Sequence, residues 1–351
     1  MLEEHQKIGV QQREGFASAW LGKWKRRAVS IPMYGLMWLM VTALSPLILP
    51  ALMVFDLMTG DMRLPRMRAM LFFILYLSVE NAGLAVSALL WLCSGACIGV
   101  NQKQYIEWNY ALQRWWSGAL WKGSVKLFSL KVKVENPPEG LQGPILLFMR
   151  HASTADTVIP ANMVANSHGI RLRYVIKKEL LWDVCLDVVG HRIPNVFIDR
   201  GSPDPGREIQ AIQELAHDIK AGEGIIIYPE GTRFHPKKLE RRLQELRRKG
   251  KNDLLHIARN FEYVLPPRLG GPLALMSAAP DADVVIGSHT GFEGAARFQD
   301  FWQGGLIDKT IHVRFQRFSR GDMPETKQQR ALWLYKCWEE IDRWIASVNA
   351  L

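Results

Sequence analysis

The chain has 351 residues, 48% of them hydrophobic, and carries a formal net charge of +10. This length accommodates one domain of moderate size together with a membrane segment. Its four cysteines do not form the pattern of a disulfide framework, and with the histidines they show no zinc-site spacing. We therefore expect no metal site and a reducing compartment.

Two apolar runs within residues 33–100 predict a membrane helical hairpin. Residues 33–58 are nearly free of charge and long enough to cross a bilayer, which takes about 20 residues. Residues 69–100 form the second run, which is interrupted by Glu80. An ionisable group at mid-membrane is costly, so Glu80 should face a partner helix unless the segment enters at an angle. The alternatives are a shallow hairpin that never fully crosses and a pair of buried core helices.

The basic N-terminal segment, residues 1–32, indicates the orientation of this hairpin. Its positive charges at residues 23–27 favour a cytoplasmic N-terminus, although arginines in the link between the two apolar runs weaken that bias. Both ends of a hairpin lie on one side of a membrane. We therefore predict an integral or tightly associated membrane protein whose main domain, residues 136–351, faces the cytoplasm.

Residues 101–135 form a Trp-rich segment between the hairpin and the remainder of the chain. It contains Trp108, Trp115, Trp116 and Trp121 among basic residues. Because tryptophan is enriched at membrane interfaces, we interpret this segment as an amphipathic helix that lies on the bilayer. The alternative is a helix whose aromatic residues pack on the protein core.

Residues 136–351 predict an α/β domain with a mostly parallel or mixed central sheet flanked by helices. Runs rich in β-branched residues and bounded by Gly or Pro are typical of buried strands. Strand-like runs occupy residues 144–150, 172–176, 193–198, 224–228, 282–287 and 310–315, and helical patterns occupy residues 205–221 and 329–348.

Polar side chains follow three of these strands. His151 and Asp156 follow the first, Arg200 follows the run at 193–198, and Glu230-Gly231-Thr232-Arg233 follows the run at 224–228. A histidine five residues before an aspartate places a base beside a carboxylate that can orient it, as acyl transfer to an alcohol requires. Taken singly, these residues also fit a hydrogen-bonded loop and surface ion pairs. Ligands of open α/β sheets bind beyond the carboxyl ends of strands, so the three strand ends together favour an active site.

These blocks resemble the glycerolipid acyltransferase family, which includes the 1-acylglycerol-3-phosphate and lysophospholipid acyltransferases. The blocks that carry the resemblance are His151 to Asp156, Phe197-Ile198-Asp199-Arg200, Glu230 to Arg233, and Val264-Leu265-Pro266-Pro267-Arg268. They cover about residues 144 to 270. Two departures are Arg150, where the family usually has Asn, and the long stretch between Arg233 and Val264, which resembles eukaryotic-type enzymes and leaves the acceptor open.

The resemblance implies a role for each of these residues. His151 would be the general base for the acceptor hydroxyl, and Asp156 would hold its tautomer. Arg200 would contact the acceptor phosphate as a permanently charged fork. Glu230, Gly231 and Arg233 would position the glycerol phosphate, with Thr232 a structural part of that substrate-binding turn. The hydroxyl would attack the thioester directly, because the sequence contains no Gly-x-Ser-x-Gly elbow for an acyl-enzyme.

The implied function is a membrane-bound acyltransferase of phospholipid biosynthesis. It would move a fatty acyl group from acyl-CoA or acyl carrier protein, its co-substrate, to lysophosphatidic acid, and it would need no cofactor. Another lysophospholipid acceptor is the first alternative, and a lipid ester or thioester hydrolase or a non-catalytic membrane scaffold is the second.

The basic stretch at residues 237–251 contains eight Lys or Arg against two Glu. It shows no nucleic-acid-binding signature. We expect its partners to be membrane lipids or an acidic carrier protein, unless it is simply a solvated helix. His289 has no motif partner in the sequence, so we interpret it as structural.

Overall fold

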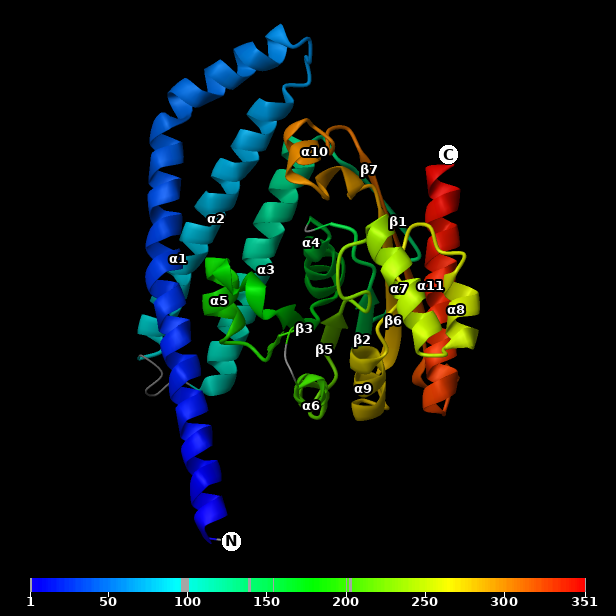
Figure 1. Ribbon diagram of the computed structural model, residues 1–351. Helices are drawn as coiled ribbons and strands as arrows, with labels where there is room; N and C mark the ends of the chain where they lie inside the picture. Colours follow the sequence, from blue (N-terminus) through cyan, green and yellow to red (C-terminus); the bar gives the residue numbers. More distant parts are fainter. Residues whose placement is uncertain are drawn as a thin grey trace.

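The computed structural model describes residues 2–95, 101–137, 140–153, 155–199, 201 and 204–350, with side chains from Trp20 onward. Three long helices come first: α1 (Leu2–Met58), α2 (Pro65–Cys93) and α3 (Gln102–Leu127). An α/β domain follows (Figure 1). The second apolar run was predicted to continue to residue 100, and its residues 96–100 lie outside the described ranges.

One seven-stranded mixed sheet forms the centre of the domain, in the order β1-β7-β6-β2-β5-β3-β4. The pairs β1–β7, β6–β2, β2–β5, β5–β3 and β3–β4 are parallel, and among the described strands only β6 and β7 pair antiparallel. The bounds are β1 (Lys131–Glu135), β2 (Ile145–Met149), β3 (Arg171–Lys177), β4 (Val196–Ile198), β5 (Glu223–Ile227), β6 (Asp283–Thr290) and β7 (Thr310–Phe318). This confirms the predicted fold class. Because β1 belongs to the sheet, the domain begins before residue 136, where we had predicted its start.

Helices cover both faces of the sheet, as buried parallel strands require. In β2, Leu146 and Phe148 point into one hydrophobic cluster, while Ile145, Leu147 and Met149 point into the other. Helices α6 (Pro205–Ala216), α8 (Asn252–Ala258), α9 (Gly270–Ala278) and α11 (Lys327–Asn349) contribute to the first cluster. The second contains residues of the α4 (Val158–Pro160) region and the end of α3.

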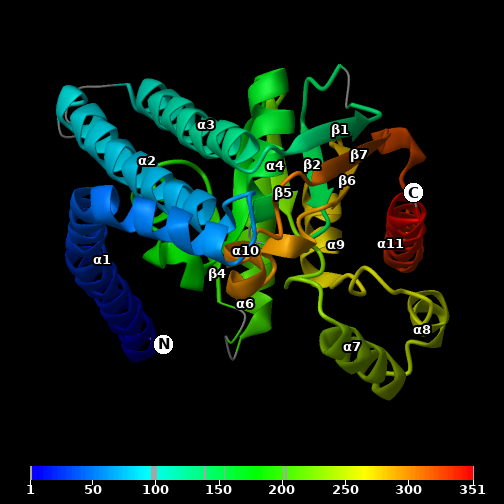
Figure 2. The same cartoon turned by 90° about the horizontal axis from the view of Figure 1, so that it is seen from above.

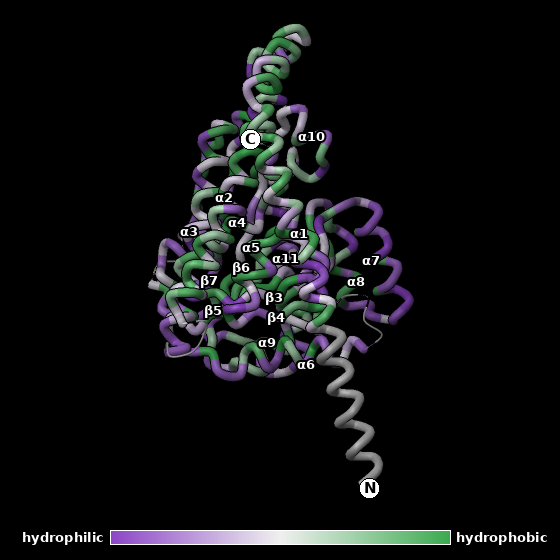
Figure 3. Tube along the Cα trace, turned by 90° about the vertical axis from the view of Figure 1, so that its left-hand side faces the viewer, coloured by the Kyte–Doolittle hydropathy of each residue, from purple (hydrophilic) through white to green (hydrophobic). Residues whose placement is uncertain are grey.

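The hairpin α1–α2 stands along one flank of the domain (Figures 1 and 2). Both helices are long and apolar enough to cross a membrane. Helix α1 is continuous through its prolines, and it bends toward its C-terminal end (Figure 1), in the part that carries Pro46 and Pro50. Its apolar side chains are largely exposed, whereas α2 is partly buried by its neighbours. Figure 3 shows the hydrophobic colouring of this flank.

Glu80 faces neighbouring helices, as the sequence predicted. It is completely buried, and one carboxylate oxygen accepts a hydrogen bond from Trp116 Nε1 of α3 (2.7 Å). The other oxygen accepts from the backbone N–H of Cys185 (3.0 Å), in α5 (Val184–Gly190). A buried carboxylate is tolerated where its oxygens are paired. Glu80 therefore joins α2 to both α3 and α5.

Helix α3 packs between α2 and the domain. Trp116 bonds Glu80, and the ring of Trp121 lies 6.5 Å from that of Phe292, centroid to centroid. Trp115 is 48% exposed. Two of the tryptophans thus contact protein, as expected for a helix packed on the core, and Trp115 remains available to an interface.

Candidate active site

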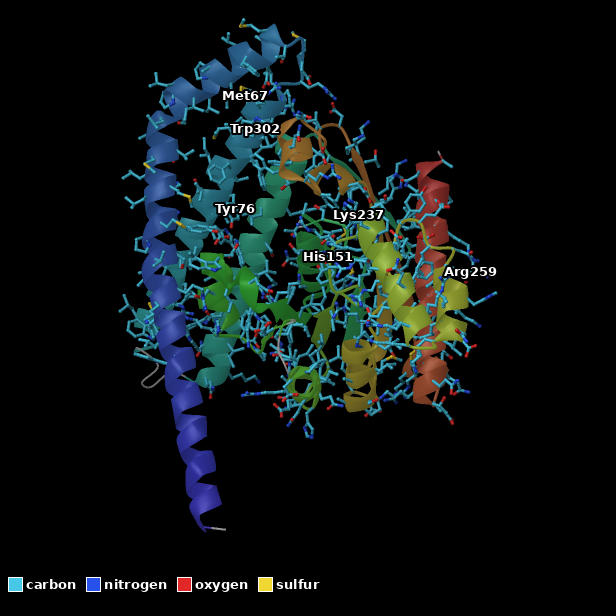
Figure 4. The ribbon with its side chains drawn as sticks, in the orientation of Figure 1. Met67, Tyr76, His151, Lys237, Arg259 and Trp302 are labelled. Atoms are coloured by element: carbon cyan, nitrogen blue, oxygen red, sulfur yellow. The ribbon has the colours of Figure 1, made fainter. Side chains whose placement is uncertain are left out.

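The predicted site residues lie at the carboxyl edge of the sheet. Strands β2 and β5 are parallel neighbours, so the residues that follow them emerge side by side. His151 follows β2 and Glu230 follows β5. His151 lies near the middle of the molecule, between the hairpin and α7 (Pro236–Arg248) (Figure 4).

His151 and Asp156 form the predicted pair. Nδ1 of His151 lies 3.1 Å from Oδ1 and 3.3 Å from Oδ2 of Asp156. Asp156 is completely buried, whereas the His151 side chain is 17% exposed. A carboxylate beside Nδ1 favours the tautomer with the proton on that nitrogen. The arrangement leaves Nε2 of His151 as the proton acceptor.

Asp156 is held by the loop that carries it. Its Oδ2 accepts hydrogen bonds from the backbone N–H groups of Ala152 (2.7 Å) and Ser153 (2.8 Å). Burial alone would raise the pKa of Asp156, but hydrogen bonds from His151 and His289 hold that pKa well below its usual range. Asp156 is therefore an ionised carboxylate at neutral pH, which is the form that orients a histidine.

His289 is a residue whose place the sequence interpretation missed. Its Nε2 lies 3.1 Å from the carbonyl oxygen of Arg150 and 3.3 Å from Asp156 Oδ2, and its side chain is fully buried. We had found no motif partner for His289, and its strand was predicted to end at residue 287. Strand β6 extends to Thr290 and pairs with β2, which brings His289 to the same edge as His151.

Arg150 stands where the resembling family usually has asparagine, and it forms a buried network of its own. Its guanidinium donates to the carbonyl oxygens of His289 (2.6 Å) and Tyr263 (2.9 Å) and to Glu293 Oε1 (2.9 Å). These bonds tie the end of β2 to the end of β6 and to the segment before Val264. The two terminal nitrogens of Arg150 are therefore paired, whereas its buried Nε has no hydrogen-bond partner in the described part of the chain.

Glu230 bonds the protein's own backbone. One of its oxygens accepts from the N–H of His151 (3.0 Å), and the other accepts from the N–H of Leu265 (3.0 Å). Its side chain is completely buried. These contacts differ from the predicted contact with glycerol phosphate. They show that Glu230 fixes the backbone of His151 relative to the Pro-containing block.

The rest of the turn lies closer to solvent. Gly231 has φ +73°, a conformation that side chains rarely adopt, and its N–H donates to the Tyr228 carbonyl (2.9 Å). Thr232 Oγ1 accepts from Lys238 Nζ (2.8 Å). Arg233 is exposed and donates to the Ala296 carbonyl (3.2 Å). Arg200, the predicted phosphate contact, and Thr154, within the His151 motif, lie outside the described ranges.

The ring of Tyr228 limits the movement of His151. The two ring centroids lie 4.8 Å apart, with the planes tilted by 46°. Tyr228 is the first residue after β5, and Glu230 follows it by two positions. The turn after β5 therefore makes two contacts with His151: Glu230 bonds its backbone N–H, and the Tyr228 ring packs against its imidazole.

Glu230 gives the fold a pH dependence near neutrality. Burial raises the pKa of Glu230 to about 7. The guanidinium of Arg150 and the two backbone N–H groups lower this pKa, but their effect is smaller than that of burial. A carboxyl group with a raised folded-state pKa contributes full stability below its unfolded-state pKa, and that contribution is lost as the pH rises through 7.

We therefore expect the wild type to lose stability relative to Glu230→Gln between pH 5 and 8, by on the order of 3 kcal/mol. Urea unfolding in detergent at several pH values, followed by tryptophan fluorescence, measures this difference. Glu325→Gln, which alters an exposed carboxyl, is the matched control. A difference between wild type and Glu230→Gln that stays constant with pH would contradict the prediction.

Comparison with known proteins agrees with this geometry. An acyltransferase family model matches residues 130–270. The chain is 22% identical over 214 residues to 1-acyl-sn-glycerol-3-phosphate acyltransferase epsilon of Mus musculus, covering 57% of this chain and 56% of the relative. It is also 22% identical over 204 residues to lysocardiolipin acyltransferase 1 of Gallus gallus, covering 56% and 51%. The chain thus spans about half the length of these relatives.

A solved structure shares the fold. The 1-acyl-sn-glycerophosphate acyltransferase PlsC from Thermotoga maritima superposes with a TM-score of 0.55 at 12% identity, covering 83% of this chain and 99% of that one. The family-model match at residues 130–270 includes the His151–Asp156 pair and the Glu230 turn, which follow β2 and β5. The acyltransferase match over residues 130–270, the two relatives and the geometry of the motif residues together support membership of the glycerolipid acyltransferase family.

Proposed function

We propose that this protein moves a fatty acyl group from a CoA or carrier-protein thioester to the free hydroxyl of lysophosphatidic acid, giving phosphatidic acid. The observation that carries the proposal is the His151–Asp156 pair, in which the carboxylate engages Nδ1 and leaves Nε2 to act as the base. The two relatives, named as acyltransferases for 1-acylglycerol-3-phosphate and for lysocardiolipin, support a lysophospholipid acceptor.

The proposed reaction is a direct transfer. Nε2 of His151 takes the proton from the acceptor hydroxyl while the oxygen attacks the thioester carbonyl carbon. The carbon–sulfur bond then breaks, and the thiolate leaves with the proton returned from the imidazolium. Asp156 stabilises that transient imidazolium charge because it is ionised and lies against Nδ1. Tyr228 and the Glu230 bond keep the ring in one orientation.

We assign recognition of the acceptor phosphate to arginine side chains at the solvent-facing rim of the site. Arg233 is exposed beside the catalytic loop, and its guanidinium is suited to a phosphate. Arg200 joins it in this proposal on the strength of the motif at residues 197–200. Gly231 gives the turn its shape, and Thr232 is held by Lys238. Glu230 contributes indirectly, because its carboxylate accepts a hydrogen bond from the backbone N–H of His151 and so fixes that backbone.

A lysophospholipid with a larger headgroup is the second candidate acceptor. The match to lysocardiolipin acyltransferase 1 favours it. So does the long segment between Arg233 and Val264, which folds into α7 and α8 beside the Glu230 turn. The reaction and its base would be the same for both acceptors.

We propose that the hairpin enters the membrane without fully crossing it, with the domain on the cytoplasmic side. Contacts between α2 and the domain extend along the helix, from Arg68 at the Leu127 carbonyl (2.7 Å), through Tyr76 at Asp183 (2.9 Å), to Arg192 at the Ser87 carbonyl (2.7 Å). Full immersion of α2 would carry these charged groups into hydrocarbon, which is costly. Helix α1, whose apolar side chains are exposed, is the part that meets lipid.

An acyl-transfer assay tests the function. Membranes containing the protein are offered labelled palmitoyl-CoA or palmitoyl-acyl carrier protein with lysophosphatidic acid, lysocardiolipin, other lysophospholipids or glycerol 3-phosphate. We expect labelled phosphatidic acid from lysophosphatidic acid. Product from another lysophospholipid alone would move the acceptor to the second candidate. Free fatty acid in every sample would identify a hydrolase, and no turnover under any condition would refute the enzyme.

A further inference from the structure

Helix α7 presents a basic stripe to solvent, with the neutral Gln244 between Arg241 and Arg248. Lys237, Arg241 and Arg248 are exposed and stand four and seven residues apart, so they lie along one face of the helix. At 1.5 Å per residue this stripe is about 16 Å long. Leu239, Leu243 and Leu246 lie on another face and pack against the domain core. Figure 3 shows α7 as a mainly hydrophilic helix.

The charges of this stripe are not used within the fold. Within the described part of the chain, Glu245 pairs with Arg242 (3.3 Å) and Lys249 (2.6 Å), and no ion pair involves Lys237, Arg241 or Arg248. Residues 237–251 hold eight Lys or Arg against two Glu, and this excess of positive charge raises the local potential for anions. The stripe therefore has the charge pattern of a surface that receives an acidic partner.

The stripe adjoins the catalytic edge. Lys238 donates to Thr232 Oγ1 (2.8 Å) and to the Arg233 carbonyl (3.1 Å), which joins the first turn of α7 to the Glu230 turn. Glu230 in turn accepts from the N–H of His151 (3.0 Å). Figure 4 shows Lys237 on the side of His151 opposite to Tyr76 of the hairpin. A partner on α7 would thus lie near the proposed base and away from the hairpin.

Its position argues against the bilayer as that partner. We assign the exposed apolar side chains of α1 to lipid, and α7 lies away from α1, in the half of the molecule that contains α8 and α11 (Figures 1 and 2). Helix α7 is therefore separated by the domain from the helix that we assign to lipid. The stripe is also too extended to be filled by one compact phosphate group.

We propose that Lys237, Arg241 and Arg248 form the docking surface for an acidic carrier protein that delivers the acyl thioester. The inference rests on the proposed acyl transfer and specifies its donor. Complementary charge would steer the carrier to α7 and speed encounter. The thioester arm would then reach His151 across the Thr232–Lys238 contact.

The test compares two donors on a triple variant, Lys237→Gln, Arg241→Gln, Arg248→Gln, in which glutamine preserves helix propensity. The matched control is Lys131→Gln, Lys133→Gln, Lys309→Gln, which removes three exposed charges beside the far edge of the sheet. Purified enzyme in neutral detergent receives lysophosphatidic acid with palmitoyl-acyl carrier protein or with palmitoyl-CoA. Neutral detergent removes the anionic bilayer from the comparison.

We expect the α7 variant to raise the KM for palmitoyl-acyl carrier protein roughly tenfold, with kcat retained and with unchanged kinetics for palmitoyl-CoA. High salt should remove the difference from wild type, because exposed charges are screened. The control variant should match wild type with both donors.

Three results would overturn the docking surface. The first is an unchanged KM of the α7 variant for palmitoyl-acyl carrier protein. The second is an equal rise in its KM for palmitoyl-CoA, which would indicate that α7 binds the nucleotide phosphates of CoA. The third is transfer by wild type from palmitoyl-CoA but not from palmitoyl-acyl carrier protein. Each of these leaves acyl transfer itself intact. Absence of transfer by wild type from either donor would instead refute the proposed function.

Discussion

Replacing His151 with alanine is expected to lower the turnover of acyl transfer by about 10²–10⁴-fold, the usual contribution of a general base. The ring is partly exposed, and its backbone bond to Glu230 does not involve the side chain, so the fold should survive. The KM for the lysolipid should change little, because no phosphate contact is lost. Initial rates with labelled thioester, together with thermal unfolding in detergent, measure both expectations.

His217→Ala is the matched control for this variant. His217 is exposed at the end of α6, on a helix that contributes no residue to the site. It should leave turnover unchanged. Normal turnover of His151→Ala would end the mechanism, whereas a loss accompanied by unfolding would leave the role of the base to be measured with His151→Gln.

Asp156→Asn is expected to reduce turnover by a comparable factor through the tautomer of His151. The backbone N–H groups of Ala152 and Ser153 hold Oδ2, and the asparagine oxygen would take that place. Its NH₂ group would then face Nδ1 of His151 and favour the tautomer with the proton on Nε2. That tautomer has no lone pair on Nε2 to accept the proton of the hydroxyl.

The double variant His151→Ala, Asp156→Asn tests this coupling. If Asp156 acts through His151, the double variant should be no slower than His151→Ala alone. A further large loss of turnover would show that Asp156 acts on the substrate or on folding independently. Thermal unfolding of each variant separates these two cases.

The His151–Asp156 pair has two further neighbours, His289 and Arg150, that a simple dyad would not have. Asp156 also contacts His289, and Arg150 links the ends of β2 and β6. Neither relation can be read from spacing, since His289 lies 133 positions after Asp156 in the chain. Only the parallel pairing of β6 with β2 brings the two residues together.

The sequence predicted strands β2 to β7 and the motif residues, whereas helices α5, α8 and α9 were not predicted. Runs such as residues 145–149 are apolar at every position, which is the pattern of a strand buried on both faces, and the structure has strand β2 there. The five-residue spacing of His151 and Asp156 lies within one loop, so their contact depended only on local geometry. Residues 33–58 likewise predicted a helix, and α1 covers them. The position of Glu80 in an apolar run predicted a contact with a neighbouring helix, and Trp116 of α3 provides it.

Tertiary structure decided the relations between distant segments. Strand order determined that β1 joins the sheet beside β7, that β6 carries His289 to Asp156, and that the Glu230 carboxylate bonds the backbone of His151. The packing of α2 against α3 and α5 likewise determined which flank of the hairpin remains exposed. Apolar periodicity reports only that a residue is buried, whereas its partner depends on how the sheet is ordered and closed by helices. The sequence therefore specified the chemistry at each strand end, and the order of the strands brought those groups into one site.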